Sequence, residues 1–159
     1  MELIGSNLDV VLRLLVAMVL GGTLGLEREL AGKKAGMRTY ALISVGSALF
    51  VVISALVTEK FVGISNFDPL RVASQIIVGI GFVGGGLIIF VENKVQGLTT
   101  AAGLWVAAGV GMASGFGLYV VAVTASAIAL FIFIVLWFVD RKFLGKKLGR
   151  FEKRKSRKK

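Results

Sequence analysis

Residues 95–139 read VQGLTTAAGLWVAAGVGMASGFGLYVVAVTASAIALFIFIVLWFV and contain no Asp, Glu, Lys or Arg. A transmembrane helix needs roughly 20 apolar residues, so an uncharged run of about 45 can hold two such helices. The 159-residue chain is 56% hydrophobic and its mean hydropathy is +0.85, which is unusual for a soluble domain. It lacks the alternating segments of about ten residues that form transmembrane β-barrels. The sequence therefore predicts an all-α integral membrane protein.

Five apolar runs predict transmembrane spans near residues 9–26, 39–58, 71–91, 99–115 and 117–139. The fourth of these spans is the shortest and is rich in Gly and Ala. Asp68 and Pro69 suit the N-cap and the first turn of the third helix. We therefore expect one transmembrane domain over residues 1–140, followed by a basic tail over residues 141–159.

The distribution of basic residues predicts the orientation in the membrane. The net charge is +10, and 11 of the 19 Lys and Arg residues follow Asp140. With five spans, this tail shares one side with Lys94 and with the basic connection between spans one and two. Lys60 and Arg71 then lie on the other side. The positive-inside rule predicts an outer N-terminus and a cytoplasmic C-terminus, whereas an even number of spans would separate the two basic segments.

Composition excludes several classes of function. The chain has no Cys and no His, which excludes disulfides, thiolate chemistry, Cys/His zinc sites and His-dependent triads. No nucleophile–base pair can be named, so we expect no enzyme and no catalytic residues. The tail has no attached soluble fold, so we expect it to bind anionic lipid headgroups and no nucleic acid. The opening MELIGSNLD lacks a basic region and a cleavage site, so we expect the first span to be retained.

Glycine is enriched to 21 of 159 residues, against a usual share of roughly 7%. Small residues four apart let helices approach closely, which is a main source of helix association in lipid. We therefore expect these glycines in helix–helix contacts: Gly21, Gly25, Gly79, Gly81, Gly85, Gly103 and Gly111. The stretch GIGFVGGGL could alternatively unwind and expose carbonyl oxygens to an ion. Five short helices cannot use all these faces internally, so we expect a homodimer or a higher oligomer.

A weak internal duplication is visible. VLRLLVAMVLGG at 11–22 resembles PLRVASQIIVGI at 69–80, and GMRTYA at 36–41 resembles GLTTAA at 97–102, with offsets that differ by three residues. Because spans one and three run in the same direction, this pattern indicates a parallel repeat of helices 1–2 and 3–4. Arg13 and Arg71 occupy matching positions near the outer ends, and we interpret both as anchors that snorkel to the interface.

The stretch GLERELAGKKAGMRTY joins spans one and two and is strongly charged. Ionisable residues within a bilayer cost about 2.5–3.5 kcal/mol on insertion scales, so each is a functional candidate with an expected partner. In span one, Arg13, Ala17, Gly21, Gly25 and Glu29 recur every four residues. Because Glu29 continues this stripe of mostly small residues, we expect it to face the bundle and to pair with Arg38. Glu27 lies about 200° away around the helix axis. Lys33 and Lys34 are interpreted as positive-inside residues.

Four segments together are distinctive: GGTLGLEREL, AGMRTYALISVGSAL, QIIVGIGFVGGGLI and GLTTAAGLWVAAGVGMASGFGLY. From about residue 12 to 125, the chain resembles the MgtC/SapB (YhiD-like) family of bacterial membrane proteins. The resemblance implies about five spans in the bacterial cytoplasmic (inner) membrane. MgtC-like members often carry a soluble C-terminal domain, and with only its basic tail the chain resembles the short members. The residues that match family motif positions, predicted as an inner-face polar cluster, are Glu27, Arg28, Glu29, Arg38, Thr39, Gln75, Thr99, Thr100 and Trp105.

The resemblance leaves two functions open. The family is associated with adaptation to low magnesium and other stress, and both magnesium transport and the regulation of other membrane proteins have been considered. We expect a non-enzymatic regulator that contacts membrane proteins. The alternative is a transporter or channel for Mg²⁺ or another cation, with Glu27 and Glu29 as candidate metal ligands and Mg²⁺ as the ion. Arg28 and Arg38 compete for those carboxylates, and Mg²⁺ commonly uses one or two carboxylates with several waters.

Overall fold

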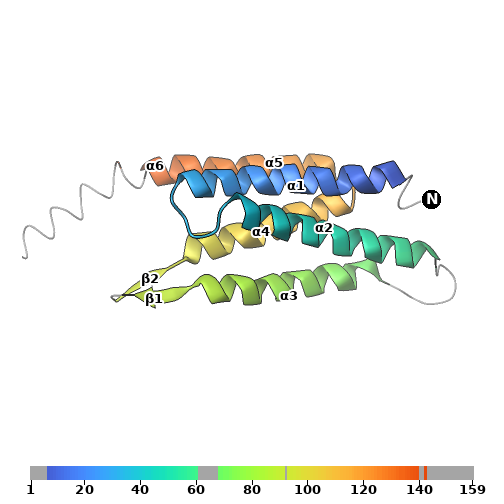
Figure 1. Cartoon of the computed structure of the whole chain (residues 1–159), viewed down its shortest axis with the longest axis horizontal. Helices are drawn as coiled ribbons and strands as arrows, with labels where there is room; N and C mark the ends of the chain where they lie inside the picture. The colour runs from blue at the N-terminus through green and yellow to red at the C-terminus, as the bar shows by residue number, and fades with distance from the viewer. Residues whose placement is uncertain (1–6, 61–67, 92, 140–141, 143–159) are drawn as a thin grey trace, which may run out of the picture.

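In a computed structural model, the protein is a bundle of long helices with one short hairpin (Figure 1). The structure describes residues 7–60, 68–91, 93–139 and 142. The helices are α1 (Asn7–Leu30), α2 (Met37–Lys60), α3 (Pro69–Leu87), α4 (Leu98–Gly115) and α5 (Tyr119–Phe131). The fifth helix continues through a π-helical turn, η1 (Ile132–Leu136), into α6 (Trp137–Val139). Strands β1 (Ile89–Val91) and β2 (Lys94–Gln96) form an antiparallel hairpin between α3 and α4.

Five helical segments are long and apolar enough to cross a membrane, with α5, η1 and α6 forming the last, Tyr119–Val139. The predicted all-α membrane fold is therefore confirmed. The predicted third span reached residue 91, but α3 ends at Leu87 and β1 follows. The chain becomes extended at Ile88, and the hairpin brings Gly97, with a φ of +92°, so close to the end of α3 that a Cβ there would lie 2.1 Å from the Leu87 carbonyl oxygen. The expected helix start is confirmed, since Asp68 Oδ1 accepts from the Leu70 N–H at 2.9 Å and Pro69 opens α3.

The core lies where α1, α2 and α4 meet. Tyr40, Leu24 and Leu104 are fully buried there. Small residues allow this packing, because a Cβ on Gly111 would lie 2.1 Å from the Ser44 carbonyl oxygen, and one on Gly25 would lie 2.7 Å from the Gly36 carbonyl oxygen. Gly21 is similarly crowded by Ser44 and the Tyr40 carbonyl of α2, and Gly103 by the side chains of Tyr40 in α2 and Phe133 in η1.

The third helix is the least covered of the five spans. Of an apolar 18-residue stretch of α3, only 11% is buried within the protein, against 56% for the corresponding stretch of α4. A Cβ on Gly79, Gly81 or Gly85 would meet nothing within 4 Å, whereas one on Gly84 would touch Ala101 of α4 at 3.5 Å. The packing role predicted for those three glycines is therefore not found within the described chain, because α3 turns Gly84 toward α4 instead.

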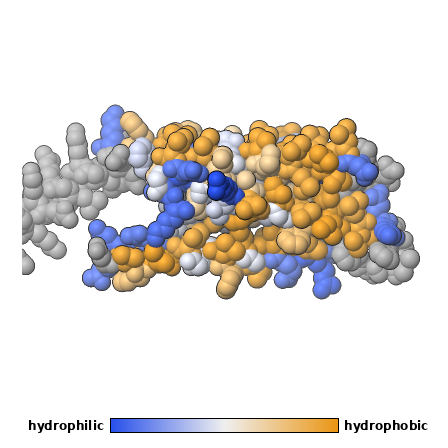
Figure 2. All heavy atoms as spheres, in the orientation of Figure 1, coloured by the Kyte–Doolittle hydropathy of each residue, from blue (hydrophilic) through white to orange (hydrophobic). Residues whose placement is uncertain are grey.

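The surface has the layering expected of a membrane protein. Hydrophobic residues cover most of the face seen in Figure 2. Hydrophilic residues lie at its two ends, and smaller groups of them lie near its centre and along its lower edge. The end of α1, the start of α2, the hairpin and α6 lie at one of these ends (Figure 1). We call it the Lys33 end, after a basic residue in the α1–α2 turn. The predicted tail lies outside the described residues apart from Lys142.

Candidate functional site

The charged centre of the Lys33 end is an ion pair between Arg28 and Glu27. The Arg28 side chain is 3% exposed, and its Nε donates to a carboxylate oxygen of Glu27, which is 17% exposed. The guanidinium carbon of Arg28 also lies 3.8 Å from the centre of the Phe133 ring in η1. A guanidinium this deeply buried requires such a partner, because an unpaired charge in this environment is costly.

Glu29 has a different role from the one the sequence predicted. Its carboxylate accepts a 3.0 Å hydrogen bond from the Met37 N–H, at the first residue of α2. It thereby satisfies one of the free N–H groups at that helix start, where a negative charge is also favoured. A Cβ on Gly36 would lie 2.5 Å from Glu29 Oε2, so glycine makes room for the carboxylate. Glu29 therefore joins the two helices through the backbone of α2.

The predicted ion pair of Glu29 with Arg38 is wrong for the described residues, where Arg38 is exposed and makes no ion pair. The reason is helical geometry. At 100° per residue, steps of four residues advance about 400°, so a stripe that starts at Arg13 has rotated by about 160° when it reaches Glu29. Arg28 lies only about 60° from the Arg13 direction. The buried face of α1 accordingly runs through Ala17, Gly21, Leu24 and Arg28, and Glu29 is exposed.

The remaining predicted residues do not form one cluster. Thr100 is buried beside the core, and its carbonyl accepts a 3.4 Å hydrogen bond from the Tyr40 hydroxyl. Thr39 is exposed, and Trp105 is 54% exposed, seven residues into α4. Gln75 lies 12 residues before the end of α3, or roughly 18 Å along the helix from the Lys33 end. Of the predicted residues, the structure therefore brings together Glu27 and Arg28 as an ion pair, and Thr99 lines the same cavity as Arg28. It places the other residues apart from this pair or in other contacts.

Sequence reasoning missed a second charged cluster at the opposite end of the bundle. Arg13 was interpreted as a snorkelling anchor, but it is only 9% exposed. Its Nε donates to Asp9 Oδ2 at 2.9 Å, and one terminal nitrogen donates to the Gly115 carbonyl at 2.8 Å, where α4 ends. Tyr119 donates to the other Asp9 oxygen at 3.4 Å. The spacing of Asp9 and Arg13, four residues apart on a helix, was the signal that could have found the pair.

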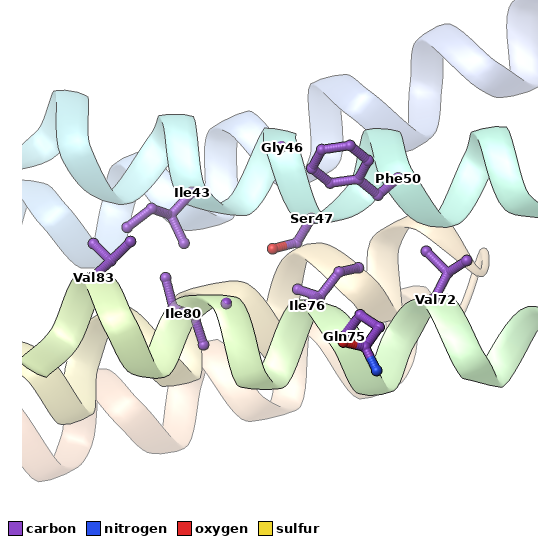
Figure 3. Close-up of a pocket in the computed structure, with 10 residues that line it drawn as sticks. Ile43, Gly46, Ser47, Phe50, Val72, Gln75, Ile76, Ile80 and Val83 are labelled. Carbon is purple, nitrogen blue, oxygen red and sulfur yellow. The ribbon is translucent and has the colours of Figure 1, made fainter.

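A cavity of about 400 Å³ separates α2 from α3 (Figure 3). Its walls are apolar except for the Ser47 hydroxyl, which points from α2 toward α3, and the Gln75 amide on α3. Its described lining residues include no carboxylate. In the described ranges there is also no group of three or more Asp, Glu, His or Cys side chains that could hold a metal.

Comparison with known proteins decides the family. Residues 14–142 match the MgtC family. The chain belongs to the MgtC family. It is 36% identical over 126 residues to a protein of Escherichia coli K12 named putative magnesium transporter YhiD, covering 78% of this chain and 59% of that one. It is 44% identical over 119 residues to an uncharacterised Synechocystis protein, covering 75% and 48%. The MgtC protein of Brucella abortus is 47% identical over 89 residues, covering 56% and 35%.

This MgtC-family chain spans about half to three-fifths of the length of the first curated relatives that it matches. No solved structure matches it significantly. The family match and the five apolar helices make it a multi-pass membrane protein.

Proposed function

We propose that this MgtC-family chain is a non-enzymatic regulator in magnesium or stress adaptation, and that it acts through contacts with membrane proteins. The observation that carries the proposal is the uncovered surface of α3. Gly81 and Gly85 are four residues apart, are flanked by the exposed Val78 and Phe82, and face no other part of the described chain. Small residues at this spacing favour close helix packing in lipid, so a second transmembrane helix fits here.

A second copy of this chain is the first occupant that we expect on α3. A symmetric pair would place the glycines of one α3 against those of its partner, since a two-fold axis brings identical surfaces together. We further propose that the Lys33 end faces the cytoplasm, with the N-terminus outside, because the basic connection, Lys94 and the basic tail then lie on one side.

Magnesium transport is the second candidate, and the name of the Escherichia coli relative favours it. The candidate ligands do not: the Glu27 carboxylate holds Arg28, and the Glu29 carboxylate holds the Met37 N–H. The α2–α3 cavity is also unsuited to Mg²⁺, which keeps several of its waters and binds carboxylate or phosphate oxygens. These contacts support regulation over transport.

Flux measurements separate the two candidates. We expect purified protein in liposomes to move no more Mg²⁺ than empty liposomes do, for the wild type and for Glu29→Gln alike. A flux in the wild type that Glu29→Gln abolishes would establish transport instead.

Growth in low magnesium tests the contact surface. In a strain that depends on this protein, Gly85→Leu should abolish growth because the new side chain blocks the approaching helix. The matched control is Gly109→Leu on α4, since a Cβ at Gly109 also meets nothing within 4 Å. Normal growth of the Gly85→Leu strain, with the protein present in the membrane, would contradict a regulatory contact at α3.

A further inference from the structure

A second cavity, of about 540 Å³, opens at the Lys33 end and differs in character from the one between α2 and α3. Arg28, Lys33 and Thr99 form its polar side, and Ile132 and Leu136 belong to its apolar side. None of the described residues that line it is acidic. We call it the inner pocket. Its position at one end of an apolar bundle is where a lipid headgroup meets the hydrocarbon core.

Arg28 brings a buried charge to the inner pocket. The pairing with Glu27 uses the Nε of Arg28, and no hydrogen bond within the described ranges uses its two terminal nitrogens. A guanidinium carries five N–H donors in a planar fork that matches the geometry of phosphate. Because Glu27 balances the charge of Arg28, Lys33 leaves the pocket with a net positive charge.

The end of α1 fixes the position of Lys33. Gly32 adopts a φ of +68°, and the N–H groups of Gly32 and Lys33 donate to the carbonyls of Glu29 and Arg28 at 3.0 and 2.9 Å. These two bonds form a Schellman motif, which turns the chain back at the helix end. Lys33 therefore follows Arg28 closely in space. Lys34, its neighbour in sequence, is not among the pocket residues.

The start of α4 adds a third attraction for an anion. Thr99 lies in the first turn of this 18-residue helix, and no side chain caps the helix at Gly97. The first N–H groups of a helix have no partner within it, and they carry the positive end of the helix dipole. Together with a buried arginine and a lysine, such a helix start is suited to a phosphate group.

The apolar side of the pocket indicates what is attached to that phosphate. Ile132 and Leu136 are 45% and 53% exposed, four residues apart on one side of the fifth span. This span lies beside α1 and ends with it at the Lys33 end (Figure 1). A water-soluble phosphate would gain nothing from these side chains, whereas a hydrocarbon chain would bury them.

We infer that the inner pocket binds one anionic phospholipid, with its phosphate at Arg28, Lys33 and the α4 N-terminus and an acyl chain along Ile132 and Leu136. This assignment does not depend on the proposed regulatory function. It also gives Lys33 a role that the sequence did not suggest, since the positive-inside rule treats Lys33 and Lys34 alike.

Native mass spectrometry of the full chain in a neutral detergent tests this inference with dioleoyl phosphatidylglycerol as the probe. Wild type should retain one phosphatidylglycerol in preference to phosphatidylcholine. Lys33→Ala should weaken retention about fivefold, the usual effect of one basic residue at a lipid surface. Lys34→Ala is the matched control and should change it less than twofold. Both lysines are exposed, so neither substitution disturbs the packed core.

Two further arms distinguish a lipid from a free phosphate. Glycerol 3-phosphate, which has the headgroup chemistry without acyl chains, should not displace the lipid at equal concentration. Leu136→Asp should reduce lipid retention because it places a charge against the acyl chain. Equal effects of Lys33→Ala and Lys34→Ala would overturn the inference in favour of diffuse attraction. Displacement by glycerol 3-phosphate would overturn the assignment of a lipid.

Discussion

The pairing of Arg28 with Glu27, in place of Glu29 with Arg38, predicts a specific pattern of energetic coupling. Removing one partner of a buried ion pair costs about 3–5 kcal/mol, because the remaining charge is left uncompensated. Since the Glu27 side chain is 17% exposed, we expect the lower end, about 3 kcal/mol, for Arg28→Met. Glu27→Gln should cost at least as much, because it leaves the more deeply buried Arg28 charge without its charged partner.

The double variant removes both charges, so it should be less destabilised than the sum of the single variants, with a coupling energy of about 2 kcal/mol. Unfolding in SDS, monitored by the loss of helical circular dichroism, gives the free energy of unfolding of the wild type, the two single variants and the double variant. The control cycle combines Glu29→Gln with Arg38→Met, which should add without coupling because Arg38 is exposed and makes no ion pair with described residues. The observed pairing would be refuted if the Glu29 and Arg38 substitutions were coupled while the Glu27 and Arg28 substitutions were additive.

Three other substitutions test the packing and the two charged ends. Gly111→Ala should destabilise the fold by about 1–3 kcal/mol in the same SDS assay, because its Cβ would lie 2.1 Å from the Ser44 carbonyl oxygen, while Gly109→Ala should not. Arg13→Leu should destabilise the protein by about 3 kcal/mol, because it removes the ion pair of Arg13 with Asp9. A surface anchor would cost less than about 0.5 kcal/mol, so an effect that small would contradict the buried role of Arg13. Glu29→Ala should increase proteolysis of the α1–α2 turn by freeing the Met37 N–H, whereas Glu29→Gln keeps an acceptor oxygen and should resist; equal cleavage of both would argue against this capping contact.

The sequence predicted the architecture well because the signals for it are long and redundant. The uncharged run before Asp140 is long enough for two spans, the three earlier apolar runs are each long enough for one, and Asp68 with Pro69 marks a helix start. The hairpin between α3 and α4 was missed because Ile89, Phe90 and Val91 are as apolar as the helix before them. Hydropathy does not distinguish the end of a span from a short strand.

The candidate site was predicted less well, because it depends on the exact direction of each side chain. Counting in steps of four selected Glu29 for the buried face, and the accumulated rotation of the helix selected Arg28 instead. The pairing of Arg13 with the end of α4 joins residues that are 102 positions apart, so no local pattern contained it. Lys33 lines the inner pocket and Lys34 does not, and this difference likewise depends on the turn at Gly32, which a sequence pattern does not reveal.

Disulfide crosslinking in native membranes tests the central claim, a protein contact at α3, most directly. Because the chain has no Cys, a single introduced cysteine reports one position without background. Val78→Cys places a thiol beside the α3 glycines, where Val78 is 68% exposed, and Val120→Cys on α5, where Val120 is 81% exposed, is the control. We predict that mild oxidation gives a crosslinked dimer for Val78→Cys and not for Val120→Cys. Equal crosslinking at both positions, or none at Val78, would contradict the account.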